Sequence, residues 1–287
     1  MAYTFFSYIC MYMKHIFSKI RNFIRTVQAH RRMPLRLEFV LSDYCNLNCK
    51  GCTHYSPLAI KEFESIETLR HDAAHLGEAV GNGISEVYLI GGETLLYPHL
   101  PEAMETMRKH FPQCRISLFT NGLLLPKMDN NFWDAVRRNK IVIAMTIYPI
   151  PFDYEAAKDL CARQGAECSI FGDRRTEGSF LRFGLDPTKS RNGRMSHFKC
   201  FNRGCISIVD SKVYPCSISA CVKHLNRACG TDFRHLPGDW VDVDEITSVR
   251  QIKKLRDRPV PFCSYCNSNP TVTKYGPSKR DKHEWTD

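Results

Sequence analysis

Residues 36–52 read RLEFVLSDYCNLNCKGC, so a short apolar run leads directly into three closely spaced cysteines. Cys45, Cys49 and Cys52 follow a CxxxCxxC spacing, with no fourth cysteine nearby. Three thiolates on such a loop can bind three corners of a cubane iron–sulfur cluster and leave its fourth iron open. A structural zinc site normally takes four protein ligands and fits less well, and incidental core cysteines seldom cluster this closely. The loop therefore predicts an iron–sulfur site.

From Leu35 to about residue 171, short apolar runs alternate with helical stretches, which is the pattern of β-α units. The expected strands are 36–41, 86–90, 115–120, 140–146 and 167–171, and the expected helices are about 63–80, 99–110, 129–138 and 154–164. Pro101 in a first turn and Asp153 at an N-cap position support two of these helices. Five such units predict a parallel sheet, either an open twisted sheet or a partial barrel.

A second cysteine-rich region follows a polar, basic stretch that begins near residue 172. It contains seven of the fourteen cysteines: Cys200, Cys205, Cys216, Cys221, Cys229, Cys263 and Cys266. A segment this short and rich in cysteine is expected to fold around a metal. The expected division is an amphipathic helix in 1–34, a β-α core in 35–195, the cysteine-rich domain in 196–268 and a flexible tail in 269–287. The other cysteines outside the first loop, Cys10, Cys114, Cys161 and Cys168, are interpreted as packing residues.

Fourteen cysteines indicate either disulfides in an oxidising compartment or metal-bound thiolates in a reducing one. A secretory signal places basic residues before its apolar run, whereas here the apolar run from Met1 to Met13 comes first. We therefore expect a cytoplasmic protein. The sequence contains no run of about 18 apolar residues, the length that a membrane-spanning helix needs, so we expect no such helix. The basic amphipathic segment 1–34 either docks on the protein itself or contacts the inner face of an anionic membrane.

The chain has 40 Lys and Arg against 30 Asp and Glu, a formal charge of +10 that invites a nucleic-acid interpretation. Seven of these excess charges lie in residues 1–37, which contain no acidic residue, so the rest of the chain is nearly balanced. The aromatic residues of this segment fit an apolar helix face better than a base-stacking surface. We expect no nucleic-acid partner, and a non-catalytic zinc or iron–sulfur protein that binds nucleic acid is the alternative of a different class.

The CxxxCxxC loop after the first strand resembles the hallmark of the radical S-adenosylmethionine (radical SAM) enzymes, and further motifs extend the resemblance. Gly91, Gly92 and Glu93 follow the second strand as the GGE motif of that family does. The resemblance implies that the carbonyls of this motif and the Glu93 carboxylate receive the amino group of S-adenosylmethionine. Asn121 in a TNG sequence and Thr146 end the third and fourth strands, where the family contacts the carboxylate or ribose of the cofactor.

The two residues that come shortly after Cys52 are further candidates. His54 and Tyr55 are placed to face the cofactor, and we expect Tyr55 to contact it. The alternative for His54 is that it makes an ordinary hydrogen bond and no cofactor contact, as histidines in loops more often do.

The resemblance implies an α/β fold, a partial (β/α)6 TIM-like barrel with its catalytic face at the C-terminal ends of the strands, followed by a small cysteine-rich domain. It also implies that Cys45, Cys49 and Cys52 bind a [4Fe–4S] cluster whose open iron chelates S-adenosylmethionine. An external electron donor of the flavodoxin or ferredoxin type would supply the electron that splits the sulfonium. The resulting 5′-deoxyadenosyl radical abstracts hydrogen from a substrate.

Cys200, Cys216, Cys263 and Cys266 resemble the ligands of the Twitch domain, in which two pairs of cysteines bind an auxiliary iron–sulfur cluster. The surrounding sequence also resembles radical SAM proteins of sugar, glycan and aminoglycoside pathways, among them the butirosin-pathway dehydrogenase. A zinc knot built on the same four cysteines is the alternative. Three more cysteines compete for a place in the set: Cys205 as a rival to Cys200, and Cys221 and Cys229.

An auxiliary cluster near a substrate radical can accept the second electron, which favours net dehydrogenation, such as alcohol to ketone. Epimerisation, in which a cysteine returns a hydrogen atom, and peptide modification are the alternatives. Arg182 and Cys205 are the candidate catalytic side chains beyond the cluster, and Arg174, Arg175 and Lys189 are further basic residues for an anionic substrate or merely a solvated loop. Peptide-modifying members usually carry an N-terminal peptide-binding domain, whereas about 34 residues precede the first strand here. A small substrate, a sugar or sugar nucleotide, is therefore expected.

Overall fold

The computed structural model describes residues 34–171, 179–200, 202–267 and 269–287. Residues Leu35–Asp287 form one compact unit. The expected N-terminal helix and its membrane contact lie outside the described residues. Within the described ranges, no helix has the length and apolar character needed to cross a membrane.

The first half of this unit consists of strands that alternate with helices. The strands are β1 (Arg36–Ser42), β2 (Glu86–Gly91), β3 (Arg115–Thr120), β4 (Ile141–Thr146) and β5 (Cys168–Phe171). The helices are α2 (Ile66–Val80), α3 (Leu100–His110), α4 (Asn130–Arg138) and α5 (Tyr154–Arg163). All five predicted strands and all four predicted helices are confirmed. Asp153 also caps α5 as predicted, because its side chain accepts a hydrogen bond from the Ala156 amide.

The second half contains shorter elements. These are β6 (Ser179–Arg182), α6 (Gly193–Phe198), β7 (Cys205–Val209), β8 (Lys212–Tyr214), α7 (Ser217–Cys229), β9 (Val241–Asp242), α8 (Val249–Asp257) and β10 (Thr271–Lys274). Short 3₁₀ helices connect many of the elements: η1 (Ser56–Leu58), η2 (Gly81–Gly83), η3 (Thr94–Leu96), η4 (Leu125–Lys127), η6 (Val243–Glu245), η7 (Pro261–Ser264) and η8 (Lys282–Glu284). These 3₁₀ helices are too short to show the periodic pattern of apolar residues from which helices and strands are predicted.

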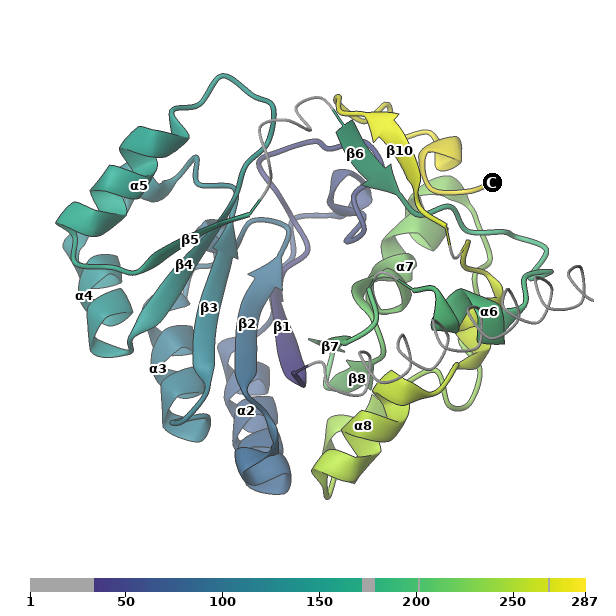
Figure 1. Ribbon diagram of the computed structural model, residues 1–287, viewed down its shortest axis with the longest axis horizontal. Coiled ribbons are helices and arrows are strands. Elements are labelled where there is room, and N and C mark those ends of the chain that lie inside the picture. Colours follow the sequence, from purple (N-terminus) through teal and green to yellow (C-terminus); the bar gives the residue numbers. More distant parts are fainter. Residues whose placement is uncertain (1–33, 172–178, 201, 268) are drawn as a thin grey trace, which may run out of the picture. The chain divides into compact units, whose positions relative to one another are not determined.

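One eight-stranded sheet organises the unit, in the order β5-β4-β3-β2-β1-β7-β8-β9 (Figure 1). Strands β1 to β5 are parallel neighbours. On its other edge β1 pairs in parallel with β7, and β8 and β9 continue antiparallel. The predicted α/β fold with a partial barrel is confirmed. Its sixth parallel strand is β7, from the cysteine-rich region, rather than a unit that follows β5 directly.

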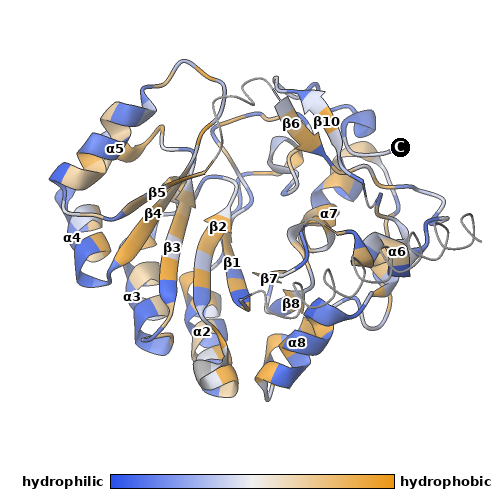
Figure 2. Ribbon diagram, viewed as in Figure 1, coloured by the Kyte–Doolittle hydropathy of each residue, from blue (hydrophilic) through white to orange (hydrophobic). Residues whose placement is uncertain are grey.

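The core lies between this sheet and the helices. Strand β4 is buried over Ile141–Met145, as expected for a parallel strand covered on both faces. Figure 2 shows β4 and much of β3 as hydrophobic, whereas α2 to α5, side by side along the sheet, are banded with hydrophobic and hydrophilic residues. The helices therefore bury one stripe against the sheet and leave the other in solvent. This packing fixes the strand ends from which the site is built.

The C-terminal residues differ from the predicted flexible tail. Strand β10 pairs antiparallel with β6, and Trp285 is only 1% exposed. The Trp285 indole N–H donates a hydrogen bond of 2.9 Å to the Cys52 carbonyl oxygen, and its ring lies against Tyr55, with 6.1 Å between the ring centroids. The segment is mostly polar, which predicts a flexible tail, but it contains one large aromatic side chain, Trp285. Burial of that side chain orders the segment.

Residues 275–285, named here the C-terminal clasp, hold the cysteine loop by its backbone. The Lys50 amide donates to the Gly276 carbonyl at 3.0 Å, and the Ser278 amide donates to the Asn48 carbonyl at 2.8 Å. Cys49 and Pro277 are the central pair of this short antiparallel bridge. The clasp therefore supplies hydrogen-bond partners for backbone groups of the loop.

Replacing the buried indole tests the clasp. We predict that Trp285→Ala lowers the free energy of unfolding by about 3–5 kcal/mol, because it removes a fully buried aromatic ring and leaves the Cys52 carbonyl without its donor. Urea unfolding followed by circular dichroism measures the change. The control is His283→Ala, at an exposed position of the same clasp. Equal, small effects of the two substitutions would mean that the clasp does not support the fold.

Candidate active site

The three cysteines of the first loop share one cavity. The loop follows the C-terminal end of β1, and Cys45, Cys49 and Cys52 all line a cavity of about 190 Å³. The ends of the neighbouring strands complete its wall with Gly91, Gly92, Thr120, Asn121 and Thr146. The structure thus brings together residues of the CxxxCxxC, GGE and TNG motifs and Thr146. They meet at the end of the barrel where catalytic residues of such folds lie.

These thiols are suited to bind a cation. None of the three forms a disulfide, and burial raises the pKa of Cys45 to about 12 and that of Cys49 to about 11. A buried thiolate is costly unless positive charge compensates it, and a bound iron supplies that charge. The Leu47 amide donates to Cys45 Sγ at 3.3 Å, a bond that also favours the deprotonated sulfur.

A single metal ion and a cubane cluster require different spacings of their cysteine ligands. Within the described part of the chain, no three His, Cys, Asp or Glu side chains converge closely enough to hold one metal ion. The sulfurs around a tetrahedral zinc lie about 3.8 Å apart, because each Zn–S bond is ~2.3 Å long. A cubane gives each thiolate its own iron and so takes sulfurs that are more widely spaced.

Gly91 and Gly92 are required by a close backbone approach. The Gly92 amide donates to the Ser42 carbonyl at 2.6 Å. A Cβ on Gly91 would lie 2.3 Å from the Ser42 carbonyl oxygen, and one on Gly92 would lie 2.2 Å from the Tyr44 carbonyl oxygen. Only glycine lets the end of β2 lie this close to the start of the cysteine loop, so the pair determines where the loop sits.

Glu93 differs from the expectation that its carboxylate receives the cofactor. Its side chain is fully buried and is not part of the cavity wall. It accepts hydrogen bonds from Thr120 Oγ1 at 2.6 Å, from the Asn121 amide at 2.9 Å and from the Leu95 amide at 3.0 Å. Burial raises the pKa of Glu93 despite these bonds. The carboxylate joins the end of β2 to the TNG turn, which leaves only the backbone of this motif to face a ligand.

His54, rather than Tyr55, lines the cavity. Tyr55 has a positive φ of 53°, is 1% exposed and packs against Trp285. Its side chain, expected from the sequence to contact the cofactor, is therefore not part of the cavity wall. His54 and Ser56 are wall residues. Burial lowers the pKa of His54 to about 4. In the described part of the chain, neither His54 Nε2 nor Ser56 Oγ has a hydrogen-bond partner.

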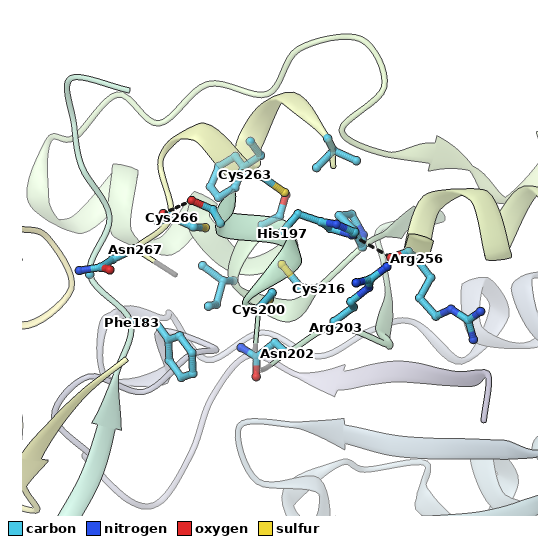
Figure 3. Close-up of a pocket in the computed structure, with 17 residues that line it drawn as sticks. Phe183, His197, Cys200, Asn202, Arg203, Cys216, Arg256, Cys263, Cys266 and Asn267 are labelled. Carbon is cyan, nitrogen blue, oxygen red and sulfur yellow. Dashed lines mark hydrogen bonds between the residues drawn. The ribbon is translucent and has the colours of Figure 1, made fainter. Parts of the chain in front are cut away.

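The four cysteines that resemble an auxiliary site share a second, separate cavity. Cys200, Cys216, Cys263 and Cys266 line a space of about 50 Å³, and Figure 3 shows their side chains gathered around it. They come from the end of α6, the start of α7, and η7 with the residues after it. Burial raises the pKa of Cys200, and the backbone hydrogen bonds from Asn202 and Arg203 oppose this. Two pairs far apart in sequence therefore converge on one site.

The competing cysteines lie elsewhere. Cys205 is not in the wall of either cavity; it begins β7 and hydrogen-bonds the buried Glu38. Cys221 is fully buried in α7, and Cys229 contacts the Arg280 carbonyl at 3.9 Å. The structure brings none of the three to the auxiliary cavity.

The basic candidates of the region after β5 are also used elsewhere. The Arg182 guanidinium donates to Asp287 Oδ1 at 3.1 Å, to the Glu284 carbonyl at 3.2 Å and to the Thr286 carbonyl. It therefore binds the C-terminal residues and not the cavity. Lys189 Nζ lies 4.9 Å from the centre of the Tyr265 ring, and Arg174 and Arg175 lie outside the described residues.

Comparison with known proteins agrees with this geometry. Residues 39–147 match the radical SAM superfamily. GTP 3′,8-cyclase 1 of Mycobacterium tuberculosis is 30% identical over 136 residues, which cover 45% of this chain and 37% of the relative. GTP 3′,8-cyclase of Helicobacter pylori is 30% identical over 109 residues, which cover 38% of this chain and 34% of the relative. The chain thus spans about a third of the length of these curated relatives.

Two solved structures share the fold over most of the chain. BtrN in complex with AdoMet and 2-DOIA superposes with a TM-score of 0.51 at 14% identity, covering 82% of this chain and 94% of BtrN. Native anSMEcpe with bound AdoMet gives a TM-score of 0.50 at 17% identity, covering 78% and 82% of the two chains. At these identities the likeness concerns the fold.

The buried carboxyl beside Cys205 gives a prediction of pH dependence. Burial raises the pKa of Glu38 above its ordinary value of 4.5, so the folded chain holds this proton at a pH where the unfolded chain has lost it. The stability that Glu38 contributes is therefore present below pH 4.5 and is lost as the pH rises through the folded pKa. Because Gln stays neutral, Glu38→Gln should become more stable relative to the unmodified chain as the pH rises above 4.5. Urea unfolding at several pH values measures this difference, and a difference that does not change with pH would contradict the prediction.

Proposed function

We propose that this chain, in which residues 39–147 form a radical SAM domain, is an enzyme that binds S-adenosylmethionine at a [4Fe–4S] cluster and oxidises a small hydroxylated substrate, a sugar or sugar nucleotide, by net dehydrogenation. The observation that carries the proposal is the presence of two separate cysteine-lined cavities in one compact unit. A radical oxidation that removes two electrons needs one centre to start the radical and a second centre to receive an electron.

Each cavity is lined by its own set of cysteines. Cys45, Cys49 and Cys52 would hold the first cluster, and the four cysteines that line the auxiliary cavity would hold the second. With both groups bound, the first cluster and S-adenosylmethionine would supply the radical chemistry of hydrogen abstraction, and the second cluster would supply a one-electron acceptor. A flavodoxin-type or ferredoxin-type donor would provide the reducing electron, which suits a cytoplasmic setting.

The residues of the chain orient the ligand and exclude water. Gly91 and Gly92 present backbone groups to the cavity, and Asn121 and Thr146 add neutral polar side chains. The aromatic part of the same wall is formed by Phe119, Tyr148 and Phe180. These rings add an apolar surface beside the polar groups, and such a surface keeps water from a reactive intermediate. A substrate carbon held between these two surfaces would be presented in one orientation.

The wall also supports the class of substrate. Its described polar side chains beyond the cysteines include Thr53, His54, Ser56 and Thr120, and two atoms of this group, His54 Nε2 and Ser56 Oγ, have hydrogen-bonding capacity that no described residue uses. Neutral groups of this kind suit hydroxyl groups. BtrN, whose solved complex holds AdoMet and 2-DOIA, shares the fold over 82% of this chain. The GTP 3′,8-cyclases match about a third of their own length, which supports the radical SAM part of the proposal rather than their substrate.

Iron content tests the two-cluster assignment. Reconstituted under anaerobic conditions, the unmodified protein should contain about eight irons, and the Cys45/Cys49/Cys52→Ala variant about four, since one [4Fe–4S] cluster is lost. The matched control is Cys114→Ala, at a buried cysteine outside both cavities, which should keep about eight. Iron and sulfide assays give the numbers. Zinc in place of iron in the auxiliary cavity would contradict the two-cluster assignment.

Product ratios distinguish dehydrogenation from epimerisation. With a sugar that is turned over, the variant with Ala at all four auxiliary cysteines should release 5′-deoxyadenosine without a matching amount of ketone, because the second electron has no acceptor. Cys205→Ala should keep the ratio of the unmodified enzyme, because Cys205 is not part of either cavity wall. Mass spectrometry of both products measures the ratio. Loss of product in Cys205→Ala alone would favour an epimerase that returns hydrogen from this thiol.

A further inference from the structure

The side chain of Tyr275 reaches a thiol of the first cysteine loop from the C-terminal clasp. Its hydroxyl oxygen lies 3.5 Å from Cys49 Sγ, within hydrogen-bonding distance for sulfur. Beside this contact, the Lys50 amide donates a hydrogen bond of 3.0 Å to the Gly276 carbonyl, which holds the clasp against the cysteine loop. The Tyr275 ring lies near two residues of the cavity wall, 5.9 Å from the Tyr148 ring centre and 6.1 Å from that of Phe180. Tyr275 is therefore held in place from both sides.

The chemistry of the pair determines which atom donates. A cysteine bound to iron is a thiolate and has no proton, so the hydrogen bond between the two groups must come from the Tyr275 O–H. Hydrogen bonds to an ionised acceptor are stronger than those between neutral groups. Removing the hydroxyl would thus leave one ligand sulfur without a side-chain donor.

We propose that Tyr275 is a positioning residue that raises the reduction potential of the first cluster by donating a hydrogen bond to the Cys49 thiolate. The inference rests on the proposed function, because it needs a cluster on Cys45, Cys49 and Cys52. Reduction adds one electron, and part of the added negative charge resides on the ligand sulfurs. A donor to one of these sulfurs stabilises the reduced form more than the oxidised form, and hydrogen bonds of this kind are a known determinant of cluster potentials.

The other described donors to these thiols are less suited to this role. The donor to Cys45 at 3.3 Å is the Leu47 backbone amide, which any side chain at that position would supply. Asn121 Nδ2 lies 3.9 Å from Cys45 Sγ, but it donates at 2.7 Å to Asn46 Oδ1. Tyr275 is thus a side chain through which substitution can change the potential without changing a ligand.

The experiment is a redox titration of the reconstituted full-length protein, followed by EPR. The signal that changes when S-adenosylmethionine is added identifies the first cluster. Tyr275→Phe keeps the ring and removes only the hydroxyl, and it should shift the midpoint potential of that signal to a more negative value at unchanged iron content. If Tyr275 acted only through packing, the Phe variant would have the potential of the unmodified protein, and only Tyr275→Leu would differ.

Two further proteins keep the test decisive. Tyr88→Phe removes a hydroxyl that donates to Glu86 at 3.0 Å, away from the cysteine loop, and should leave the potential unchanged. Incorporation of 3-fluorotyrosine at position 275 keeps the shape of the ring but makes the phenol more acidic and a stronger donor, so it should shift the potential to a less negative value. This variant gives a result even if Tyr275→Phe does not load a cluster.

The outcomes separate this inference from the function on which it rests. A cluster that binds normally, with the same potential in the Phe and fluorotyrosine proteins as in the unmodified one, overturns the role of Tyr275 and leaves the proposed function standing. A protein that binds no cluster at Cys45, Cys49 and Cys52 overturns the proposed function itself.

Discussion

The position of the loop that carries Cys45, Cys49 and Cys52 is the constraint on which the rest of the structure depends. A loop has few backbone partners of its own, and three thiols on it face one cavity only if it is held from outside. The end of β2 holds one side, where Gly91 and Gly92 allow the backbone to approach. The C-terminal clasp holds the other side through backbone bonds to Asn48 and Lys50 and through the Trp285 indole.

The same constraint connects the two halves of the chain. Strand β1, which leads into the loop, pairs with β2 on one edge and with β7 of the cysteine-rich region on the other. Tyr55, just after Cys52, is fully buried with the thiols of Cys52, Cys216 and Cys266 among its neighbours, and its pKa is raised well above the ordinary value, chiefly by burial. The two cysteine-lined cavities therefore belong to one continuous core, as an enzyme that moves electrons between two centres would need.

Much of the core could be predicted from the sequence, because periodic apolar runs and motifs at strand ends are local signals. The five strands and their helices follow from such signals. So do seven residues of the first cavity wall: Cys45, Cys49, Cys52, Gly91, Gly92, Asn121 and Thr146. The role of Glu93 could not be predicted, because its partners Thr120 and Asn121 come from another strand. That His54 and not Tyr55 lines the cavity could not be predicted either, because the backbone at Tyr55 has a positive φ that no sequence pattern indicates. The clasp depends on contacts between residues about 230 positions apart, which no local pattern reveals.

We propose that one chain holds two iron–sulfur clusters and that the first keeps an iron free for S-adenosylmethionine. A Mössbauer spectrum of protein reconstituted with the iron-57 isotope, recorded before and after addition of S-adenosylmethionine, tests this most directly. We predict two [4Fe–4S] clusters, with one iron of one cluster changing its Mössbauer parameters when the cofactor binds. A single cluster, or two clusters of which neither changes, would contradict it.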